Sequence, residues 1–434
     1  MNNILFFISI LAAKSINKTI RFLRLGQGGT LAGKLAVKIY PDLLKNFKYK
    51  NNHRIILITG TNGKSTTSGI LASILESCGK KVAYNKSGAN LISGIATTLC
   101  FFANLKGFLD YDFIILEVDE AALQHVTKQI NSHIIAVTNL FRDQLDRFGE
   151  LDTTLKLIEK GISNNRNAFL ILNADDSKLL SIKADNEKIF FGFKNNSETT
   201  DIQSDWLSDP IELGEKSPTT IIKNFLGCNL KTDSLSSSFE IKHDSFTINK
   251  QLFFLPFIGM FNIYNALCAV AIAKTITNVT PVQIQKGFST YSTIFGRAEK
   301  INIHNKSAWI YLIKNPAGTT EVLKTLTKQN NARFLIALND NIADGRDVSW
   351  IWDARFDLLD KHNKQIFVTG KRAYDMALRL KYGNVGDIVI EEDIEDAIKL
   401  ALSNLNTNEI LFILPTYTAL LEMQKKKISK EQPL

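Results

Sequence analysis

From Arg54 onward, short β-branched or aromatic runs alternate with helix-length segments, and this alternation limits the possible folds more than any other feature of the sequence. Parallel strands need long crossover connections, usually helices, so this alternation predicts βαβ units and an α/β fold with a parallel central sheet. A second alternation begins after Gly296 and predicts a smaller, Rossmann-like domain. The candidate strands are Arg54–Thr59, Lys81–Tyr84, Phe113–Val118, His133–Thr138 and Ala168–Leu172, then Ala308–Ile313, Arg333–Leu338, Gln365–Thr369, Asp387–Ile390 and Glu409–Leu414.

One segment, residues 195–250, interrupts the first alternation. It is rich in Ser, Thr, Asn and Asp, and its two short strand candidates, Thr220–Phe225 and Ser238–Lys242, are expected to be antiparallel. We interpret it as an insertion in the first α/β domain, which helices near Asn262–Thr275 and Pro281–Tyr291 then close. The length of 434 residues allows about two or three domains. The predicted organisation is a helical leader over residues 1–50, a central domain over 51–295 and a C-terminal domain over 296–434.

The N-terminus contains a ten-residue apolar run, Ile4–Ala13, which has the length of a signal-peptide core. The basic residues that precede such a core are missing, and the run is about half the ~20 residues of a membrane-spanning helix. Lys14, Lys18, Arg21 and Arg24 follow it. The segment therefore predicts an amphipathic helix that packs on the protein body or, as the alternative, lies on a membrane surface.

Four scattered cysteines, Cys78, Cys100, Cys228 and Cys268, form no CxxC pair. Their spacing argues against a disulfide framework and against a cysteine-built zinc site, and it favours a reducing, cytoplasmic location. The 52 basic and 43 acidic residues give a formal net charge of +9. This modest excess is compatible with an anionic partner without identifying one, and we expect no nucleic-acid ligand.

The strongest motif is ILITGTNGKSTT, in which a hydrophobic strand leads through a glycine turn into a helix. Backbone N–H groups of such a loop surround nucleotide phosphates, while the lysine neutralises charge and the serine holds magnesium. Ile58 replaces the first glycine of the general P-loop pattern, and a tight turn that merely contains Gly-Lys is the alternative interpretation. We predict an ATP site whose phosphates are held by Gly60, Thr61, Asn62, Gly63, Lys64, Ser65 and Thr66.

Charged residues follow two later strand ends. Glu117, in ILEVDE, ends a buried-strand pattern, where a carboxylate suits Mg²⁺ that also contacts substrate phosphates. Asp119 and Glu120 fit a solvated acidic loop as an alternative. The segment TNLFRDQLDRFGE, residues 138–150, indicates either a second part of the site or a capped surface helix. Its charged residues include Arg142, Asp143, Asp146 and Arg147.

Six motifs in order resemble the ATP-dependent Mur ligases and their folylpolyglutamate synthase relatives. They are GTNGKS at Gly60–Ser65, the strand-end Glu117, TNLFRDQLD at Thr138–Asp146, LNADD at Leu172–Asp176, GMFNIYNALCAVAIA at Gly259–Ala273 and GRAE at Gly296–Glu299. Those enzymes phosphorylate a carboxylate with ATP and let an amine attack the acyl phosphate. The resemblance implies that residues 51–295 are a Mur-ligase ATPase domain, in which Asn262 approaches the adenine and Arg297 the γ-phosphate. By the same analogy Lys314 and Asn315 touch the acyl phosphate or substrate, or are loop residues around Pro316.

The chain also departs from the Mur ligases. Gln144 and Phe261 stand where those enzymes usually carry histidine, and no domain for a UDP-linked precursor is recognisable. A standard amino-acid-adding ligase is therefore disfavoured. LIKNPAGTTEVL at Leu312–Leu323 and ALNDNIADGRDVSWIWD at Ala337–Asp353 instead resemble the MurT family, the ligase subunits of lipid II isoglutaminyl synthases.

This second resemblance implies ATP-dependent amidation of the D-glutamate α-carboxylate of lipid II to D-isoglutamine, with a GatD-like glutaminase as partner in a heterodimer. It places the protein in the cytoplasm, free or peripheral at the inner membrane face. No cysteine of the chain has a nucleophile-like setting with a histidine base, so glutamine hydrolysis would occur on another chain.

The resemblance further implies that Asp347 completes the partner's Cys-His pair by orienting the histidine. A helix N-cap before residues 348–350 is the other interpretation of Asp347. Asp344 is its nearest rival, and Arg346 is expected to be an anchoring contact.

Many MurT chains carry a four-cysteine zinc ribbon in the segment that corresponds to residues 195–250. Here the segment keeps Cys228, with His243 as the nearby histidine, whereas a structural zinc needs four ligands. We therefore predict an insertion without zinc.

The predicted catalytic residues are Lys64, Glu117 and Asp347, with Mg²⁺ at Ser65 and Glu117. Two other functions stay open. A stand-alone Mur or folylpolyglutamate-type amino-acid ligase is opposed by Gln144, Phe261 and the DGRDVSW segment. A non-catalytic nucleotide-binding regulatory subunit is opposed by the joint presence of Lys64, Ser65 and Glu117.

Overall fold

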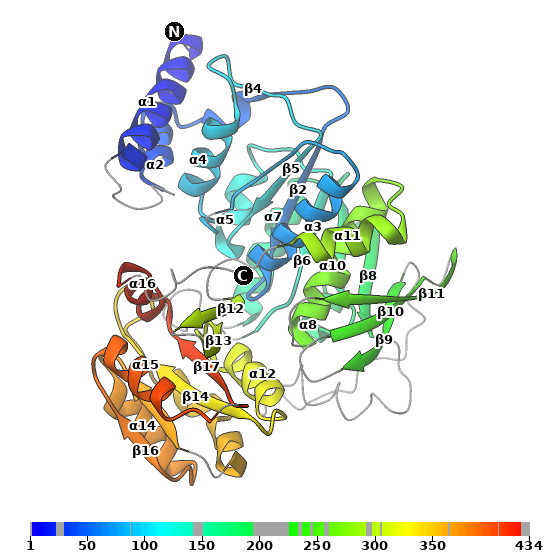
Figure 1. The fold of residues 1–434 in the computed structure, drawn as a ribbon. Helices are drawn as coiled ribbons and strands as arrows, with labels where there is room; N and C mark the ends of the chain where they lie inside the picture. The colour runs from blue at the N-terminus through cyan, green and yellow to red at the C-terminus, as the bar shows by residue number, and fades with distance from the viewer. Residues whose placement is uncertain are drawn as a thin grey trace.

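The computed structural model describes residues 2–22, 30–86, 88–141, 151–193, 225–232, 237–243, 246–255, 260–291, 297–303, 306–362, 365–406 and 408–426. Within these ranges the chain forms a nine-stranded sheet, a six-stranded sheet and a two-stranded pair of β1 (Lys48–Tyr49) with β4 (Phe108–Leu109). In Figure 1 the smaller sheet lies below the larger one, and the N-terminal helices lie at the opposite end.

The nine-stranded sheet has the order β11-β10-β9-β8-β7-β6-β2-β5-β3. The pairs from β3 to β9 are parallel, and β10 is antiparallel to both of its neighbours. The strands are β2 (Arg54–Thr59), β3 (Val82–Tyr84), β5 (Phe113–Glu117), β6 (Ile134–Val137), β7 (Phe169–Asn173), β8 (Lys188–Phe193), β9 (Phe225–Thr232), β10 (Ser237–His243) and β11 (Phe246–Leu255). Since the chain continues from β2 to β3 on one side and later reaches β6 on the other, the carboxyl end of β2 lies at a switch point, where such sheets bind ligands.

Helices cover both faces of this sheet, and alternate strand residues point to opposite faces. Ile55 and Leu57 of β2 pack in a cluster with the helices of one face, whereas Ile56 and Ile58 pack with the helices of the other. Burial on both sides explains why the central strands read as continuous apolar runs. One set of helices is α1 (Asn2–Phe22), α2 (Leu31–Ile39), α4 (Ile92–Phe102), α5 (Glu120–Val126), α7 (Leu151–Ser163) and α8 (Ser177–Leu180), and the other is α3 (Lys64–Ser77), α10 (Met260–Ile276) and α11 (Pro281–Thr290).

The smaller sheet has the order β12-β13-β17-β14-β15-β16, and only its edge pair, β12 with β13, is antiparallel. Its strands are β12 (Arg297–Ile303), β13 (Lys306–Tyr311), β14 (Ala332–Ala337), β15 (Ile366–Thr369), β16 (Ile388–Ile390) and β17 (Ile410–Pro415). The helices around it are α12 (Pro316–Leu326), α13 (Trp350–Asp353), α14 (Ala373–Tyr382), α15 (Ile394–Ser403) and α16 (Tyr417–Lys425). Short 3₁₀ helices cover Leu43–Asn46 and Phe356–His362.

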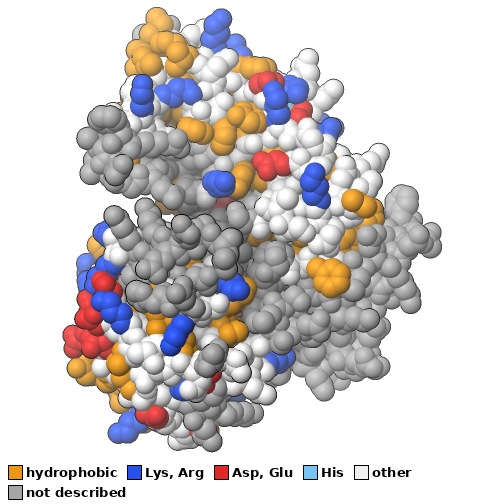
Figure 2. Space-filling model, viewed as in Figure 1, with side chains coloured by type: hydrophobic (Ala, Val, Ile, Leu, Met, Phe, Trp, Pro, Cys, Tyr) orange, Lys and Arg blue, Asp and Glu red, His pale blue; other side chains and the backbone are white. Residues whose placement is uncertain are grey.

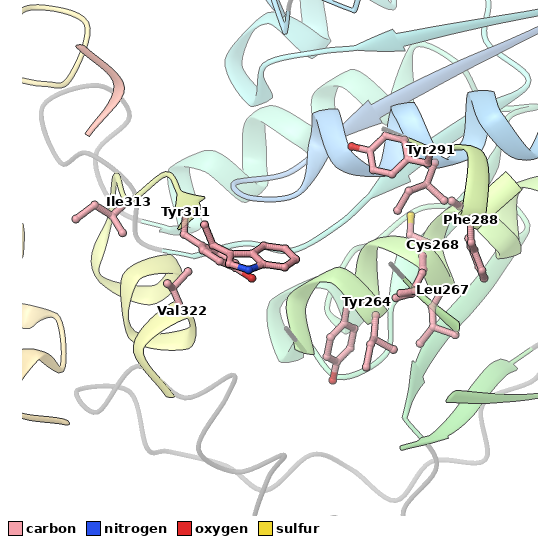
Figure 3. Packing of buried hydrophobic residues seen from close by; sticks show 14 of the residues in the cluster. Tyr264, Leu267, Cys268, Phe288, Tyr291, Tyr311, Ile313 and Val322 are labelled. Atoms are coloured by element: carbon pink, nitrogen blue, oxygen red, sulfur yellow. The ribbon is translucent and has the colours of Figure 1, made fainter. Parts of the chain in front are cut away.

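A buried apolar cluster includes residues from both sheets. Figure 3 shows side chains of β13, α12 and the loop between them on one side and side chains of α10 and α11 on the other. The residues labelled there are Tyr264, Leu267, Cys268, Phe288, Tyr291, Tyr311, Ile313 and Val322. This packing holds the loop that follows β13 against the carboxyl end of the larger sheet.

The predicted strands of both alternations match strands of the structure with shifts of at most two residues at either end, so the doubly wound architecture is confirmed. The segment at 195–250 differs in detail. Ser238–Lys242 lies within the antiparallel strand β10, but β9 begins at Phe225, where the other predicted strand ends. Phe225, the one described residue of that prediction, does lie in a strand, but the strand continues to Thr232, which the prediction missed; residues 220–224 lie outside the described residues. Strands β9 to β11 continue the main sheet.

The N-terminal helix α1 is 21 residues long, because it continues beyond the apolar run from Lys14 to Phe22, where Ile16 packs on the core and Asn17 is buried. Its window Asn3–Ile20 is long and apolar enough to cross a membrane by length and composition alone, and 28% of that window is buried. The argument that this segment is too short was therefore wrong. The expected packing on the protein body is confirmed, since Phe6, Ile10 and Ala13 are buried.

Candidate functional site

The loop between β2 and α3 depends on two glycines with left-handed backbone. Gly60 has φ 120° and Gly63 has φ 84°, a region that residues with a Cβ rarely adopt. A Cβ on Gly60 would lie 2.4 Å from Thr138 Oγ1, and one on Gly63 would lie 2.0 Å from Asn265 Oδ1. The loop is therefore packed between the end of β6 and helix α10, which fixes its shape.

Helix α3 begins at Lys64 directly after this loop, and its N-cap residue Gly63 supplies no side chain to cap the helix. The first N–H groups of a helix lack intrahelical acceptors and carry a partial positive charge. Ser65 and Thr66 are buried in this first turn. This arrangement suits an anion such as a phosphate group.

The ammonium group of Lys64 is held inside the site. Its Nζ donates to the Gly60 carbonyl and, at 2.9 Å, to Glu120 Oε1, and the two side chains are 10% and 7% exposed. Asp119, which caps α5 through the N–H of Ala121, is buried as well, and burial together with neighbouring Glu120 raises the pKa of its carboxyl. The interpretation of Asp119 and Glu120 as a solvated acidic loop was therefore wrong. The two charged residues directly after a buried strand were the available signal for a lysine partner.

Ser65 and Glu117 come together as the sequence predicts. Ser65 Oγ donates to Glu117 Oε2, and both residues are buried. Asn85 fixes the end of β5, because its amide accepts from the Glu117 N–H at 2.8 Å and donates to the Glu117 carbonyl at 2.9 Å. A Cβ on Gly88 would lie 3.5 Å from Ser65 Oγ, so the backbone of this loop lies close to the serine. A hydroxyl and a carboxylate oxygen at the start of α3 are the kind of ligands that Mg²⁺ takes beside phosphates. In the described part of the chain no group of three or more His, Cys, Asp or Glu could hold a metal.

Asn62 connects the loop with the smaller sheet. Its N–H donates to Asn139 Oδ1 at 2.9 Å, and its Oδ1 accepts from Asn315 Nδ2 at 3.2 Å. Lys314 Nζ donates to the Thr61 carbonyl at 3.4 Å. The buried Asn62 Nδ2 has no acceptor among the described residues, which costs free energy unless a ligand oxygen accepts from it. Lys314 and Asn315 therefore contact the predicted phosphate loop, and Asn315 also caps α12 through the Gly318 N–H.

The LNADD motif fixes the chain segment that follows β6 and connects the end of β7 with α10. Asp176 Oδ2 accepts from the Leu140 N–H at 2.7 Å, while its Oδ1 caps α8. Asp175 Oδ2 accepts from the Tyr264 hydroxyl at 2.7 Å, which ties the end of β7 to α10. The motif is therefore structural in this protein, and it positions the chain that leaves β6.

Stability is expected to depend on pH through Asp176, because burial raises the pKa of this carboxyl to about 6. The folded-state pKa of Asp176 lies above the unfolded value of 3.8. The contribution of this carboxyl to the free energy of unfolding is therefore fully present below pH 3.8 and is lost as pH rises through about 6. Relative to Asp176→Asn, the free energy of unfolding of the unmodified protein should fall by about 1.4 kcal/mol between pH 5 and pH 7.5. Urea unfolding of both proteins at the two pH values measures this difference. Parallel pH dependences would contradict the shift.

The two predicted nucleotide contacts, Asn262 and Arg297, lie on α10 and β12. Asn262 is buried on α10, one turn before Asn265, whose amide accepts from the Thr67 hydroxyl at 3.4 Å. Arg297 begins β12, where its backbone pairs with Tyr311. Residues 142–150, which include Arg142, Asp143, Gln144, Asp146 and Arg147, lie outside the described residues.

The segment after β14 carries Asp347 on an exposed loop. Asp347 Oδ1 accepts from the Ser349 N–H at 2.8 Å, and this hydrogen bond lowers the pKa of the carboxyl. Helix α13 begins at Trp350 with Ser349 as its N-cap residue, so the interpretation of Asp347 as the helix N-cap was wrong. An exposed, ionised carboxylate is compatible with the predicted role. Asp344 is different, because it is buried and its carboxylate accepts from the Thr418 N–H, the Thr418 hydroxyl and the Asn341 N–H. Asp344 holds the loop against α16, and Arg346 is exposed.

The chain matches two families of known sequences. Residues 58–273 match the Mur ligase middle domain, and residues 312–420 match the MurT ligase C-terminal domain. The "lipid II isoglutaminyl synthase (glutamine-hydrolyzing) subunit MurT" of Streptococcus pneumoniae is 32% identical over 98% of this chain and 97% of its own length. The chain belongs to the MurT family. It is therefore a ligase of the Mur ligase superfamily, as the six ordered motifs predicted, and the DGRDVSWIWD segment predicted its MurT family.

Solved structures show the same fold. MurF from Acinetobacter baumannii superposes with a TM-score of 0.66 at 17% identity, covering 92% of this chain and 81% of that one. The folylpolyglutamate synthase of Mycobacterium tuberculosis, solved with ADP and AMPPCP, superposes with a TM-score of 0.65 at 13% identity, covering 99% of this chain and 100% of the other. The predicted Mur-ligase architecture is confirmed.

Proposed function

We propose that this MurT-family ligase amidates the D-glutamate α-carboxylate of the lipid II stem peptide, using ATP and ammonia from a glutaminase partner. One observation carries the proposal: the predicted phosphate loop contacts the MurT-type C-terminal domain through the hydrogen bonds Asn62–Asn315 and Thr61–Lys314. The helix that follows this loop has no side-chain cap at its N-terminus. The relative named above has a lipid II isoglutaminyl synthase activity in its name, which supports the same substrate here. The role belongs to peptidoglycan synthesis.

Nucleotide binding follows from the loop. The loop begins at Gly60 and leads into the first turn of α3. Together they present backbone N–H groups, the Asn62 amide and the Lys64 ammonium. We propose that they hold ATP phosphates, with Asn262 near the adenine and Arg297 near the γ-phosphate by analogy with Mur ligases. ADP in a structural neighbour at 13% identity is consistent with this proposal.

Ser65 and Glu117 would hold Mg²⁺, because their oxygens already lie together and the adjoining Gly88 leaves no side chain in the way. When bound, the ion would neutralise phosphate charge. Two protein ligands are enough, since Mg²⁺ keeps several waters and shares substrate oxygens.

The proposed reaction has two steps. A carboxylate oxygen of the substrate attacks the γ-phosphorus of ATP, ADP leaves, and an acyl phosphate forms. Ammonia then attacks the acyl carbon, phosphate leaves, and the nitrogen loses a proton to give the amide. Lys64 stabilises charge on the transferring phosphoryl group, as Coulomb attraction in a water-poor site predicts. Lys314, whose Nζ donates to the Thr61 carbonyl, is proposed to do the same for the acyl phosphate.

The partner is proposed to dock beside Asp347. On α14 the side chains of Tyr374, Leu378 and Tyr382 follow one another at four-residue spacing and are 63%, 48% and 72% exposed. The ring of Tyr382 lies 5.6 Å from that of Trp352, just after the Asp347 loop. Exposed aromatic stripes of this kind mark protein interfaces. We propose that a GatD-like glutaminase covers this stripe in a heterodimer and that Asp347 orients its catalytic histidine.

The domain organisation is proposed as predicted, with a helical leader at 1–50, the ATPase domain at 51–295 and the MurT-type domain at 296–434. The two sheets and the N-terminal helices agree with these divisions without fixing the boundary residues. The absence of zinc from residues 195–250 also stays a prediction, because the side chains of Cys228 and His243 are outside the described part. We propose a cytoplasmic protein that works at the inner membrane face, where a lipid-linked substrate would be.

The decisive experiment is to incubate the protein with lipid II, ATP, Mg²⁺ and ammonium and to analyse the stem peptide by mass spectrometry. Conversion of one carboxylic acid to its amide, dependent on ATP, is the expected result. Addition of a whole amino acid, when amino acids are supplied, would instead show a stand-alone Mur-type ligase. No ATP turnover under any condition, with the protein folded, would show a regulatory nucleotide-binding subunit.

A further inference from the structure

Helix α1 carries two apolar faces, and within the described part of the chain one is buried and the other is exposed. Phe6, Ile10 and Ala13 are buried. On another face Ile4, Phe7, Ile8 and Leu11 follow the i, i+3, i+4, i+7 spacing of a helical stripe, and they are 65%, 42%, 43% and 43% exposed. A continuous apolar stripe of this size on a surface usually marks a binding site.

The segment 101–108 extends this surface. Lys14 Nζ of α1 donates to the Phe101 carbonyl at 3.1 Å, and a Cβ on Gly107 would lie 2.4 Å from the Phe6 ring, so the segment runs beside α1. We call the exposed apolar side chains of both parts the N-terminal patch. It consists of Ile4, Phe7, Ile8, Leu11, Phe101, Leu105 and Phe108. Figure 2 shows hydrophobic side chains next to basic ones at the end of the molecule that holds α1.

Basic residues predominate around the N-terminal patch. The first acidic residue of the chain is Asp42, and none occurs from Ser77 to Leu109. Lys18 of α1 and Lys106 of the segment 101–108 are exposed, and so are Lys34 and Lys38 on the neighbouring helix α2. The N-terminal 41 residues also contain Lys14, Arg21 and Arg24. Asp42 and Asp110, the acids that flank these segments in the sequence, pair with Lys45 and Lys81. Apolar side chains with an excess of cations match an anionic lipid surface, which accepts the apolar groups and attracts the charges. A second copy of this chain would present the same positive field and be repelled.

We propose that the N-terminal patch docks the protein on an anionic lipid bilayer, with α1 lying in the interface. The other face of α1 argues against a spanning helix. The Phe6 ring packs edge-on against Tyr40 and Phe47 at centroid distances of 6.0 and 5.5 Å, and the polar Ser9 and Asn17 are buried. Crossing the bilayer would break these contacts. The proposal stands on this surface alone and does not depend on the proposed reaction.

Flotation of the full chain with lipid vesicles tests the proposal. The protein should float with vesicles of phosphatidylcholine and phosphatidylglycerol, and at least tenfold less with phosphatidylcholine alone. Phe7→Gln/Leu11→Gln should reduce bound protein at least tenfold, since both residues are exposed and contribute to the apolar face. Lys18→Glu/Lys34→Glu should do the same on the anionic vesicles, and added salt should weaken binding of the unmodified protein.

Matched controls use exposed residues elsewhere. Val282→Gln/Leu400→Gln removes comparable apolar groups, and Lys286→Glu/Lys328→Glu makes the same charge change; both variants should float like the unmodified protein. Circular dichroism and thermal unfolding verify that every variant is folded. Absence of flotation by the unmodified protein would overturn the proposal. Equal binding by the patch variants, or resistance of the bound protein to alkaline carbonate extraction, which indicates a spanning helix, would also overturn it.

Discussion

Lys64→Ala is expected to lower amidation of lipid II by roughly 10³-fold, with ammonia and with glutamine alike. The reason is the position of the Lys64 ammonium between the Gly60 carbonyl and Glu120, at the N-terminus of α3 where the phosphates are proposed to lie. Both nitrogen sources need the acyl phosphate, so neither should bypass the loss. Mass spectrometry of the stem peptide, with either nitrogen source, measures it.

The buried ion pair makes the design of this experiment important. Removing Lys64 leaves Glu120 charged and buried, and an orphaned charge of this kind costs about 3–5 kcal/mol of stability. Lys64→Ala/Glu120→Gln removes the orphaned charge, so its folding should be restored while its activity stays low. Lys183→Ala, at an exposed lysine, is the matched control and should be fully active. Activity retained by folded Lys64→Ala would remove this loop from the mechanism.

The sequence was sufficient to predict the loop because its chemistry is local. Gly60 and Gly63 adopt backbone angles that favour glycine, and Ser65 and Glu117 follow the strands whose parallel order brings their ends together. Partners far apart in the chain were harder to predict. The hydrogen bond of Asn62 to Asn315 joins residues 253 positions apart and depends on how the smaller sheet packs.

The same distinction explains the errors. Glu120 looked solvated because an acidic run after a strand gives no information about burial, and only the closed fold shows that Lys64 neutralises it. The length of α1 was underestimated because its apolar run was counted alone, whereas later residues such as Ile16 and Asn17 pack on the body and continue the helix. In both cases tertiary contact decided what local pattern left open.

Asp347→Asn is expected to lower glutamine-dependent amidation by roughly 10³-fold or more, while ammonia-dependent amidation stays within about twofold of the unmodified protein. The structure makes this substitution mild for the fold. The Ser349 N–H can donate to an asparagine oxygen as it does to Asp347 Oδ1, so the turn should persist. The variant loses the negative charge of the carboxylate. The lowered pKa of Asp347 keeps this charge at neutral pH, and the charge would orient the partner's histidine. Parallel assays with each nitrogen source in the assembled complex measure the split.

Three variants separate a positioning effect on the partner's histidine from other causes. Asp353→Asn changes an exposed carboxylate a few residues further on and should leave both activities intact. Tyr374→Ala/Tyr382→Ala should lower glutamine-dependent amidation through weaker association, so that excess partner restores it, whereas excess partner should not restore Asp347→Asn. Asp344→Ala should resemble Asp347→Asn more weakly, because it frees the loop from Thr418 without removing the Asp347 charge. An equal loss of both activities in Asp347→Asn would move this residue to the ligase site, since ammonia-dependent turnover does not require the glutaminase.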